Sequence, residues 1–247
     1  MVEPRLPQST VRFVDNYRRA YQHLFSDVRS FEAFTSLHLG LVAPLPRKSL
    51  PAIAKTGGLP NDQVLHHFLT HSPWQVGALR YQRLSLILEQ IQRQPIVLVL
   101  DDTGDRKKGK TTDYVDRQYI GKVDNGMVSV NAYGVLDDLT FPLLFKVFKP
   151  RRRLKAEDVY QTRLQLAEKI IQELLDFGFH FSLVRADSFY GESHPFLTVL
   201  DELKLLWIMA IRSNHGVWMP KEAEISYSAW RAFERVFANG ETQTRYI

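Results

Sequence analysis

Cysteine and long apolar runs are both missing from this chain of 247 residues. The lack of cysteine excludes structural disulfides, thiolate nucleophiles and zinc sites with cysteine ligands, and it is compatible with a reducing compartment. No apolar run approaches the ~18 residues that a membrane-spanning helix needs, and the start of the chain lacks the charged-then-apolar order of a signal peptide. We therefore expect a cytoplasmic protein that makes no contact with a membrane.

A hydrophobic content of 45% is enough for a substantial core, and it excludes a disordered chain. The net charge of +5 is moderate, so the position of the basic residues matters more than their sum. They gather in two predicted loops, 106–110 and 146–155, where a backbone can present several cations to phosphate oxygens. A solvated charged turn is the alternative for each loop taken alone. The candidate phosphate-binding residues are Lys107, Lys108, Lys110, Lys149, Arg151, Arg152, Arg153 and Lys155.

Residues 1–94 carry no strand pattern and are predicted to form a small, all-helical N-terminal domain. Apolar residues recur at helical spacing near its start and again just before Pro95, and prolines and glycines divide the region between them into short helices. The turn at Gly57 and Gly58 could join two helices in a helix-turn-helix. The domain could therefore bind DNA, and a plain packing domain is the alternative.

The pattern changes after Pro95, because short Val- and Leu-rich runs of the kind that form buried strands begin there. Strands are predicted at 96–100, 127–135, 141–148, 181–187 and 205–211, with helices at 164–174 and 195–203. Asp137 and Asp138 mark a hairpin turn, and Gly178 a left-handed helix end. Three antiparallel strands followed by right-handed parallel crossovers define an α/β, ribonuclease H-like mixed sheet at 95–213.

Two of the predicted strands end at carboxylates, one at Asp101 and Asp102 and the other at Asp187. The ribonuclease H-like topology places these strands side by side, so their carboxylates can converge on a divalent cation that prefers oxygen ligands. Neighbouring side chains on a strand point to opposite faces, so we expect Asp102 to be the first ligand, with Asp101 in reserve. Each aspartate taken singly is better explained as a cap or turn residue, and it is their joint position at the ends of two neighbouring strands that favours a metal site.

Four motifs together resemble the DDE transposases of bacterial insertion sequences, most closely the insertion sequence 701 group, which is related to the insertion sequence 4 type. They are Asp101-Asp102-Thr103-Gly104, Lys107-Lys108-Gly109-Lys110, Arg117-Gln118-Tyr119-Ile120-Gly121 and Asp187-Ser188-Phe189-Tyr190-Gly191. The resemblance covers essentially the whole chain.

The resemblance implies Mg²⁺ or Mn²⁺ as cofactor, cleavage and transfer of DNA strands at terminal inverted repeats, and a nucleoid-associated protein. It makes Asp102 and Asp187 the first two acids of the catalytic triad. Double-stranded DNA, as terminal repeats and as target, is the implied partner, and a homodimer on DNA is left open. We add Arg117 to the DNA-binding candidates, while Arg117, Tyr119 and Tyr190 could also position the substrate or the acids, or simply pack.

The third acid is where this sequence departs from the family pattern, which has a glutamate on a helix after the fifth strand and after a β-rich insertion. Four glutamates occur late in the chain, Glu222, Glu224, Glu234 and Glu241, but none lies in a long helical pattern. Asn239 and Gly240 predict one more hairpin. We therefore expect residues 214–247 to be the start of a truncated β-rich insertion, and the chain alone to be inactive in cleavage.

Two other functions are compatible with the sequence. The first is a transposase remnant that binds DNA through its helical domain and basic loops without cleaving it. The second is a metal-dependent phosphatase of the doubly wound type, because an apolar strand ending in Asp-Asp-Thr-Gly-Asp is also typical of aspartyl-phosphate chemistry. The haloacid dehalogenase pattern requires Asp-x-Asp, however, and Thr103 follows Asp102 here.

Overall fold

The computed structural model describes residues 12–109, 112–212, 232–236 and 240–246. The chain forms two compact units, Met1–Ala210 and Ile211–Ile247. The predicted division into a helical domain at 1–94, a core at 95–213 and a β-rich start at 214–247 stays a prediction.

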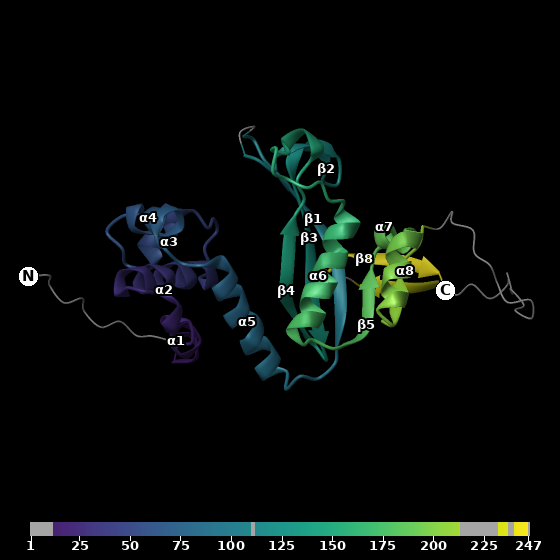
Figure 1. Ribbon diagram of the computed structural model, residues 1–247, viewed down its shortest axis with the longest axis horizontal. Helices are drawn as coiled ribbons and strands as arrows, with labels where there is room; N and C mark the ends of the chain where they lie inside the picture. Colours follow the sequence, from purple (N-terminus) through teal and green to yellow (C-terminus); the bar gives the residue numbers. More distant parts are fainter. Residues whose placement is uncertain (1–11, 110–111, 213–231, 237–239, 247) are drawn as a thin grey trace, which may run out of the picture. The chain divides into compact units, whose positions relative to one another are not determined.

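The N-terminal part of the first unit is helical, as the sequence predicts (Figure 1). It contains α1 (Arg12–Arg19), η1 (Gln22–Leu24), α2 (Val28–Val42), α3 (Leu50–Thr56), α4 (Gln63–His71) and α5 (Val76–Gln90). Helices α2, α3 and α4 contact one another around a small core centred on Ile53 and Leu65. The last helix, α5, buries Leu84 and Leu88 in the core of the sheet that follows.

The rest of the first unit contains a six-stranded mixed sheet. Its strands are β1 (Ile96–Arg106), β2 (Asp116–Tyr119), β3 (Val123–Leu136), β4 (Leu139–Val147), β5 (Phe181–Ala186) and β6 (Trp207–Met209). The order is β2-β3-β1-β5-β6, and β4 also pairs with β3. The pairings of β3 are antiparallel, whereas β1–β5 and β5–β6 are parallel. The predicted adjacency of the strands that carry Asp102 and precede Asp187 is confirmed. The first strand does not end at Asp102, however, because β1 continues to Arg106 by pairing with β3.

Strand β2 is a strand that the sequence does not predict, because its segment Asp116–Tyr119 has the composition of a polar loop. Its four residues alternate between half-buried and exposed positions, and they pair with the first residues of β3, from Val123 to Gly126. The pairing is made by backbone groups, so it leaves little apolar pattern in the sequence. Strand β2, the last residues of β1 and the first residues of β3 form a ribbon that carries the first basic loop.

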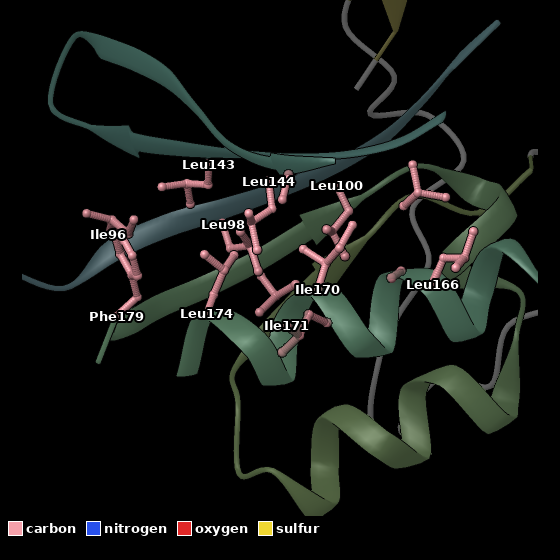
Figure 2. Packing of buried hydrophobic residues seen from close by; sticks show 14 of the residues in the cluster. Ile96, Leu98, Leu100, Leu143, Leu144, Leu166, Ile170, Ile171, Leu174 and Phe179 are labelled. Atoms are coloured by element: carbon pink, nitrogen blue, oxygen red, sulfur yellow. The ribbon is translucent and has the colours of Figure 1, made fainter. Parts of the chain in front are cut away.

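Three helices follow β4: α6 (Arg163–Phe177), α7 (Ser188–Gly191) and α8 (His194–Glu202), and a short helix, η2 (Arg151–Arg153), precedes them. Alternate residues of β1, namely Ile96, Leu98 and Leu100, pack against Ile170 and Leu174 of α6 (Figure 2). Burial of such side chains is the main stabilising contribution to the fold. Helix α6 begins at a capping box formed by Thr162 and Gln165 and ends at Gly178, whose φ of 102° confirms the predicted left-handed cap.

The second unit contains a hairpin of β7 (Ala232–Val236) and β8 (Thr242–Tyr246). Gly240 in the connection has a φ of 83°, which glycine adopts without strain. The hairpin predicted from Asn239 and Gly240 is thus confirmed, while Asn239 itself lies outside the described residues. Within the described ranges, none of the helices has the length and apolarity to cross a bilayer.

Candidate functional site

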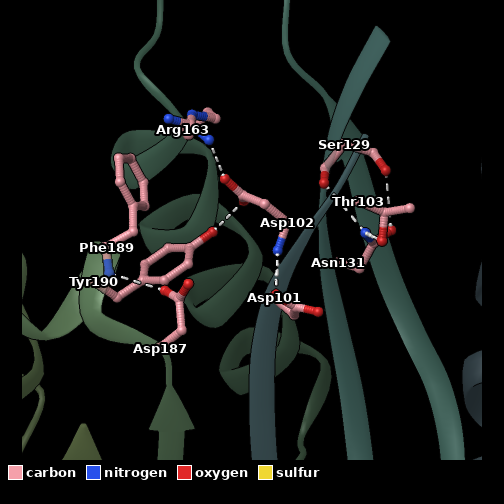
Figure 3. Close-up of polar contacts among 9 residues, drawn as sticks. All are labelled: Asp101, Asp102, Thr103, Ser129, Asn131, Arg163, Asp187, Phe189 and Tyr190. Atoms are coloured by element: carbon pink, nitrogen blue, oxygen red, sulfur yellow. Dashed lines mark hydrogen bonds and ion pairs between the residues drawn. The ribbon is translucent and has the colours of Figure 1, made fainter. Parts of the chain in front are cut away.

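Strand β1 delivers two adjacent carboxylates to the end of the sheet that carries α7. Asp102 continues the series of Leu98 and Leu100, so its side chain lies on the face covered by α6, whereas Asp101 points the other way (Figure 3). The backbone N–H of Asp102 donates to Oδ1 of Asp101 at 2.9 Å. The two neighbours therefore occupy different surroundings, as the alternation of a strand requires.

Asp187 follows the last residue of β5 and caps α7. Its Oδ1 accepts a hydrogen bond from the backbone N–H of Phe189 at 3.0 Å, so the side chain is held by the turn that it begins. Gly191 closes this short helix against β6, where an added Cβ would lie 2.2 Å from the carbonyl oxygen of Ala210. Helix α7 is thus fixed at both ends.

The Asp102 carboxylate is held by one residue from each of two helices (Figure 3). The hydroxyl of Tyr190 in α7 donates to its Oδ1 at 2.6 Å. Nη1 of Arg163 in α6 donates to its Oδ2 at 2.5 Å, and the guanidinium lies 4.0 Å from the ring centre of Phe189. Strand β1, α6 and α7 therefore meet at a single carboxylate.

Tyr190 connects the two predicted acids. Its side chain is fully buried, and its hydroxyl is directed at Asp102 (Figure 3). Asp187, which begins the same short helix, is near enough for its charge to act on the phenol. Burial raises the pKa of Tyr190 far above its ordinary value, and the negative charges of Asp102 and Asp187 add to this effect. Tyr190 therefore remains a neutral donor, and the two carboxylates border the same phenol.

The nearby negative charges also affect the pKa of Asp101. Burial raises the pKa of Asp101, the hydrogen bond from the Asp102 backbone opposes that shift, and the charges of Asp187 and Asp102 reinforce it. A divalent cation would relieve the repulsion among the three carboxylates.

The chemistry of these groups fits a hard divalent cation. An ionised carboxylate offers about four lone-pair sites, and the contacts with Tyr190 and Arg163 use two of those on Asp102. The Asp102 side chain is 19% exposed, so an ion could reach it from solvent. Over the ranges that the structure describes, however, His, Asp and Glu side chains nowhere gather in a group of three that could hold a metal.

The first basic loop is partly neutralised by nearby acids. Lys107 forms an ion pair with Asp105, and Arg106 pairs with Asp124 at 3.0 Å. Lys108 and Arg117 are exposed, and neither has an acidic partner among the described residues, whereas Lys110 lies outside them. The DNA-binding role of Lys107, Lys108, Lys110 and Arg117 stays a prediction.

Two ion pairs hold the second basic loop in place, one within the loop and one to the segment before β2. Lys149 pairs with Asp158, and Lys155 pairs with Asp113 at 2.8 Å. Nε of Arg153 donates to the carbonyl oxygen of Val115 at 2.9 Å, which joins this loop to the segment before β2. Lys149 and Lys155 are therefore both paired with acids in this structure.

Two exposed cations remain at the surface of the second loop. The guanidinium of Arg151 lies 4.4 Å from the ring centre of Tyr160, and Arg152 is exposed. The five residues of this loop that the sequence predicts to bind DNA, Lys149, Arg151, Arg152, Arg153 and Lys155, keep that role as a prediction. Arg151, Arg152 and Lys155 are exposed, whereas Arg153 is half-buried.

Arg163 is the site residue that sequence reasoning missed. It stands alone in a helix start, outside both basic clusters, and its partner Asp102 is distant in the sequence. Only the packing of α6 against β1 brings the two together. Tyr190 was among the candidates because it lies in the Asp187 motif, and its contact with Asp102 shows how it is used. Tyr119, by contrast, is 67% exposed on β2, away from the acids.

Comparisons with known proteins bear on this site. A family model described as DDE superfamily endonuclease matches residues 20–232. The chain is 54% identical over 251 residues to a protein of Microchaete diplosiphon named "Probable transposase for insertion sequence element IS701". That alignment covers 100% of this chain and 66% of the relative, so the chain spans 66% of the relative's length. Among solved structures, the Drosophila P element transposase strand transfer complex matches with a TM-score of 0.27 and 11% identity, over 77% of this chain and 42% of that one.

Proposed function

Because the chain belongs to the DDE superfamily endonuclease family, we propose that it is a DNA transposase of a bacterial insertion sequence, or the larger part of one. The proposed reaction is metal-dependent cleavage of DNA strands at terminal inverted repeats, followed by strand transfer. The observation that carries this proposal is the convergence of Asp102 and Asp187 on Tyr190. The relative from Microchaete diplosiphon supports it by its name.

We propose further that the sheet is ribonuclease H-like. In support, β1, β3 and β4 form an antiparallel meander, and β5 and β6 are added in parallel beside β1 through helical crossovers. The same antiparallel pairing of β1 with β3 argues against the phosphatase alternative, because a doubly wound sheet is mostly parallel.

Asp102 and Asp187 are the residues that we propose to hold Mg²⁺ or Mn²⁺, with Asp101 as a reserve ligand. A bound pair of such ions would activate the attacking oxygen and stabilise the leaving oxygen of an in-line displacement. The contribution of the protein is to orient the ligands. Tyr190 and Arg163 fix the Asp102 carboxylate by hydrogen bonds of 2.6 and 2.5 Å, and the Phe189 backbone fixes Asp187. Partners of this kind orient metal ligands in proteins.

We also propose that the chain alone binds DNA without cleaving it. In support, no three His, Asp or Glu side chains of the described residues form a group that could hold a metal. Glu234 lies on β7 and Glu241 follows Gly240, both in the second unit, while Glu222 and Glu224 lie outside the described ranges. The chain alone would then act as a transposase remnant that binds DNA without cleaving it, although its family is that of an endonuclease.

One experiment tests these proposals together. The purified chain is incubated with DNA that carries the terminal repeats of the element, with Mn²⁺, over a range of salt concentrations. We expect binding that weakens with salt and no nicks. The variant with Arg151→Ala, Arg152→Ala and Arg153→Ala should bind more weakly and with a smaller salt slope.

Three results would contradict the proposals. Nicking that Asp102→Ala abolishes would show that the chain is catalytically complete. A lack of DNA binding at every salt concentration would remove the transposase assignment, and an unchanged affinity of the triple variant would remove the assignment of η2 to the DNA path. Thermal unfolding of the triple variant provides the control for folding.

A further inference from the structure

We infer that Arg163 binds a phosphate of the DNA backbone at the mouth of the site formed by Asp102 and Asp187. The inference rests on the proposed function and deepens it, because it names the cation that would bring the backbone to the acids. Arg163 lies in neither basic cluster of the sequence. In the structure it is the cation that contacts a candidate catalytic carboxylate.

The backbone of Arg163 is fixed by the start of α6. Thr162 and Gln165 form a capping box in which the Thr162 hydroxyl accepts from the Gln165 N–H at 3.2 Å, and the Gln165 side chain accepts from the Thr162 N–H at 2.9 Å. Arg163 is the first residue of the helix. Leu166 and Ile170 of the same helix are buried in the core. The Cα of Arg163 therefore has little freedom to move away from the site.

The side chain of Arg163 is held on two sides. Nη1 donates to Asp102 Oδ2 at 2.5 Å, and the guanidinium lies over the Phe189 ring at 4.0 Å. Stacking on an aromatic ring directs the planar group and leaves its edges open for hydrogen bonds. The guanidinium has five N–H donors, and Asp102 accepts from one of them in the part of the chain that the structure describes.

The remaining donors can reach solvent. The Arg163 side chain is 28% exposed, and Phe189 beneath it is 39% exposed. Arg163 is therefore a counter-ion with unused hydrogen-bonding capacity at the edge of a site that opens to solvent. A planar fork of N–H donors matches two oxygens of a phosphate, which a lysine ammonium cannot do in the same way.

Charge gives the reason why a phosphate would need this residue. Asp101, Asp102 and Asp187 together carry three negative charges when ionised, and they repel a DNA backbone. Among the described residues, Arg163 is the cation in direct contact with them. A phosphate that approaches the acids would therefore meet attraction first at Arg163.

The test compares the DNA affinity of Arg163→Ala, Arg163→Lys and wild type in EDTA, with a fluorescein-labelled duplex of random sequence as the probe. We expect Arg163→Ala to weaken binding about tenfold, as for the loss of a charge-assisted hydrogen bond, and to reduce the salt slope by about one. Arg163→Lys should keep the salt slope. The control is Lys169→Ala on the exposed side of α6, which removes the same charge and should change neither quantity.

A second comparison separates a phosphate contact from a purely structural role. In the Asp102→Asn background, Arg163 loses its anionic partner, so a role limited to holding Asp102 disappears there. If Arg163 contacts phosphate, Arg163→Ala weakens DNA binding in this background as well. Melting curves monitor folding, and Arg163→Lys keeps the charge should the alanine variant unfold.

Three results would overturn the inference: an unchanged Kd and salt slope of Arg163→Ala, a loss of affinity that vanishes in the Asp102→Asn background, or a salt slope of Arg163→Lys as small as that of the alanine variant. If wild type fails to bind the duplex, the proposed function fails as well. If wild type binds and the Arg163 variants match it, the inference alone fails.

Discussion

The hydrogen bond from Tyr190 to Asp102 gives the most detailed prediction. Tyr190→Phe removes one oxygen atom and keeps the ring, which packs against Phe189 and Phe196 with ring centres 5.2 and 5.4 Å away. The lost interaction is a 2.6 Å hydrogen bond from a fully buried phenol to a carboxylate. Its removal therefore changes a polar contact without creating a cavity.

The magnitude follows from the partners that remain. A hydrogen bond to a charged group contributes roughly 1.5–3 kcal/mol to stability. Arg163 still neutralises Asp102, and the Asp102 side chain is 19% exposed, so water can replace part of the lost bond. We therefore expect the lower end of the range, about 1.5 kcal/mol, which corresponds to a fall in Tm of roughly 3–6 °C for a chain of this size.

The assay is urea unfolding of Tyr190→Phe and of Asp102→Asn, singly and combined. Tyr133→Phe is the matched control, because Tyr133 is half-buried on β3 and its hydroxyl has no hydrogen bond among the described contacts. The two substitutions at the site should be strongly non-additive, since both remove the same interaction. Full additivity, or a Tyr190→Phe variant as stable as the control, would refute the reasoning.

Two further predictions concern the parts that shape the site. The hydrogen bond from Lys149 holds the pKa of Asp158 below its usual 3.8, so the stabilisation by this pair is present above pH 3.8 and is lost as the pH falls through the folded-state pKa. The acid unfolding curves of wild type and Asp158→Asn should therefore converge at low pH. A constant separation between the two curves would contradict this account. Gly191→Ala places a Cβ 2.2 Å from the carbonyl oxygen of Ala210 and should lower the free energy of unfolding in urea by about 1–3 kcal/mol. Gly77→Ala is the control, because the added Cβ meets nothing within 4 Å there and should not destabilise the protein.

Much of the sheet could be predicted from the sequence, because burial leaves a period-two pattern and turns need particular residues. The apolar run that ends at Leu100 and the left-handed Gly178 are signals of this kind, and they located β1 and the end of α6. Strand β2 left no such signal, because its residues form backbone pairs on an exposed ribbon. Structure that depends on backbone pairing alone could therefore not be predicted from the sequence.

The acids of the candidate site could be predicted from the sequence, but the residues that contact them could not. Asp102 and Asp187 stand out because each follows an apolar run of the sequence, and the two runs lie in adjacent parallel strands. Arg163 is far from Asp102 in the sequence, and its role depends on the way in which α6 packs on β1. The ion pair of Lys155 could not be predicted either, because its partner Asp113 lies in the segment before β2.

The central claim is that Asp102 and Asp187 together bind a divalent ion, and a Mn²⁺ titration followed by electron paramagnetic resonance tests it directly. Because loss of an outer-shell partner already costs about tenfold or more in metal affinity, we expect Asp102→Asn and Asp187→Asn each to weaken Mn²⁺ binding by at least that factor. Asp105→Asn, which changes an exposed carboxylate of the same strand that pairs with Lys107, should leave it unchanged. Wild-type affinity in both site variants would contradict the account.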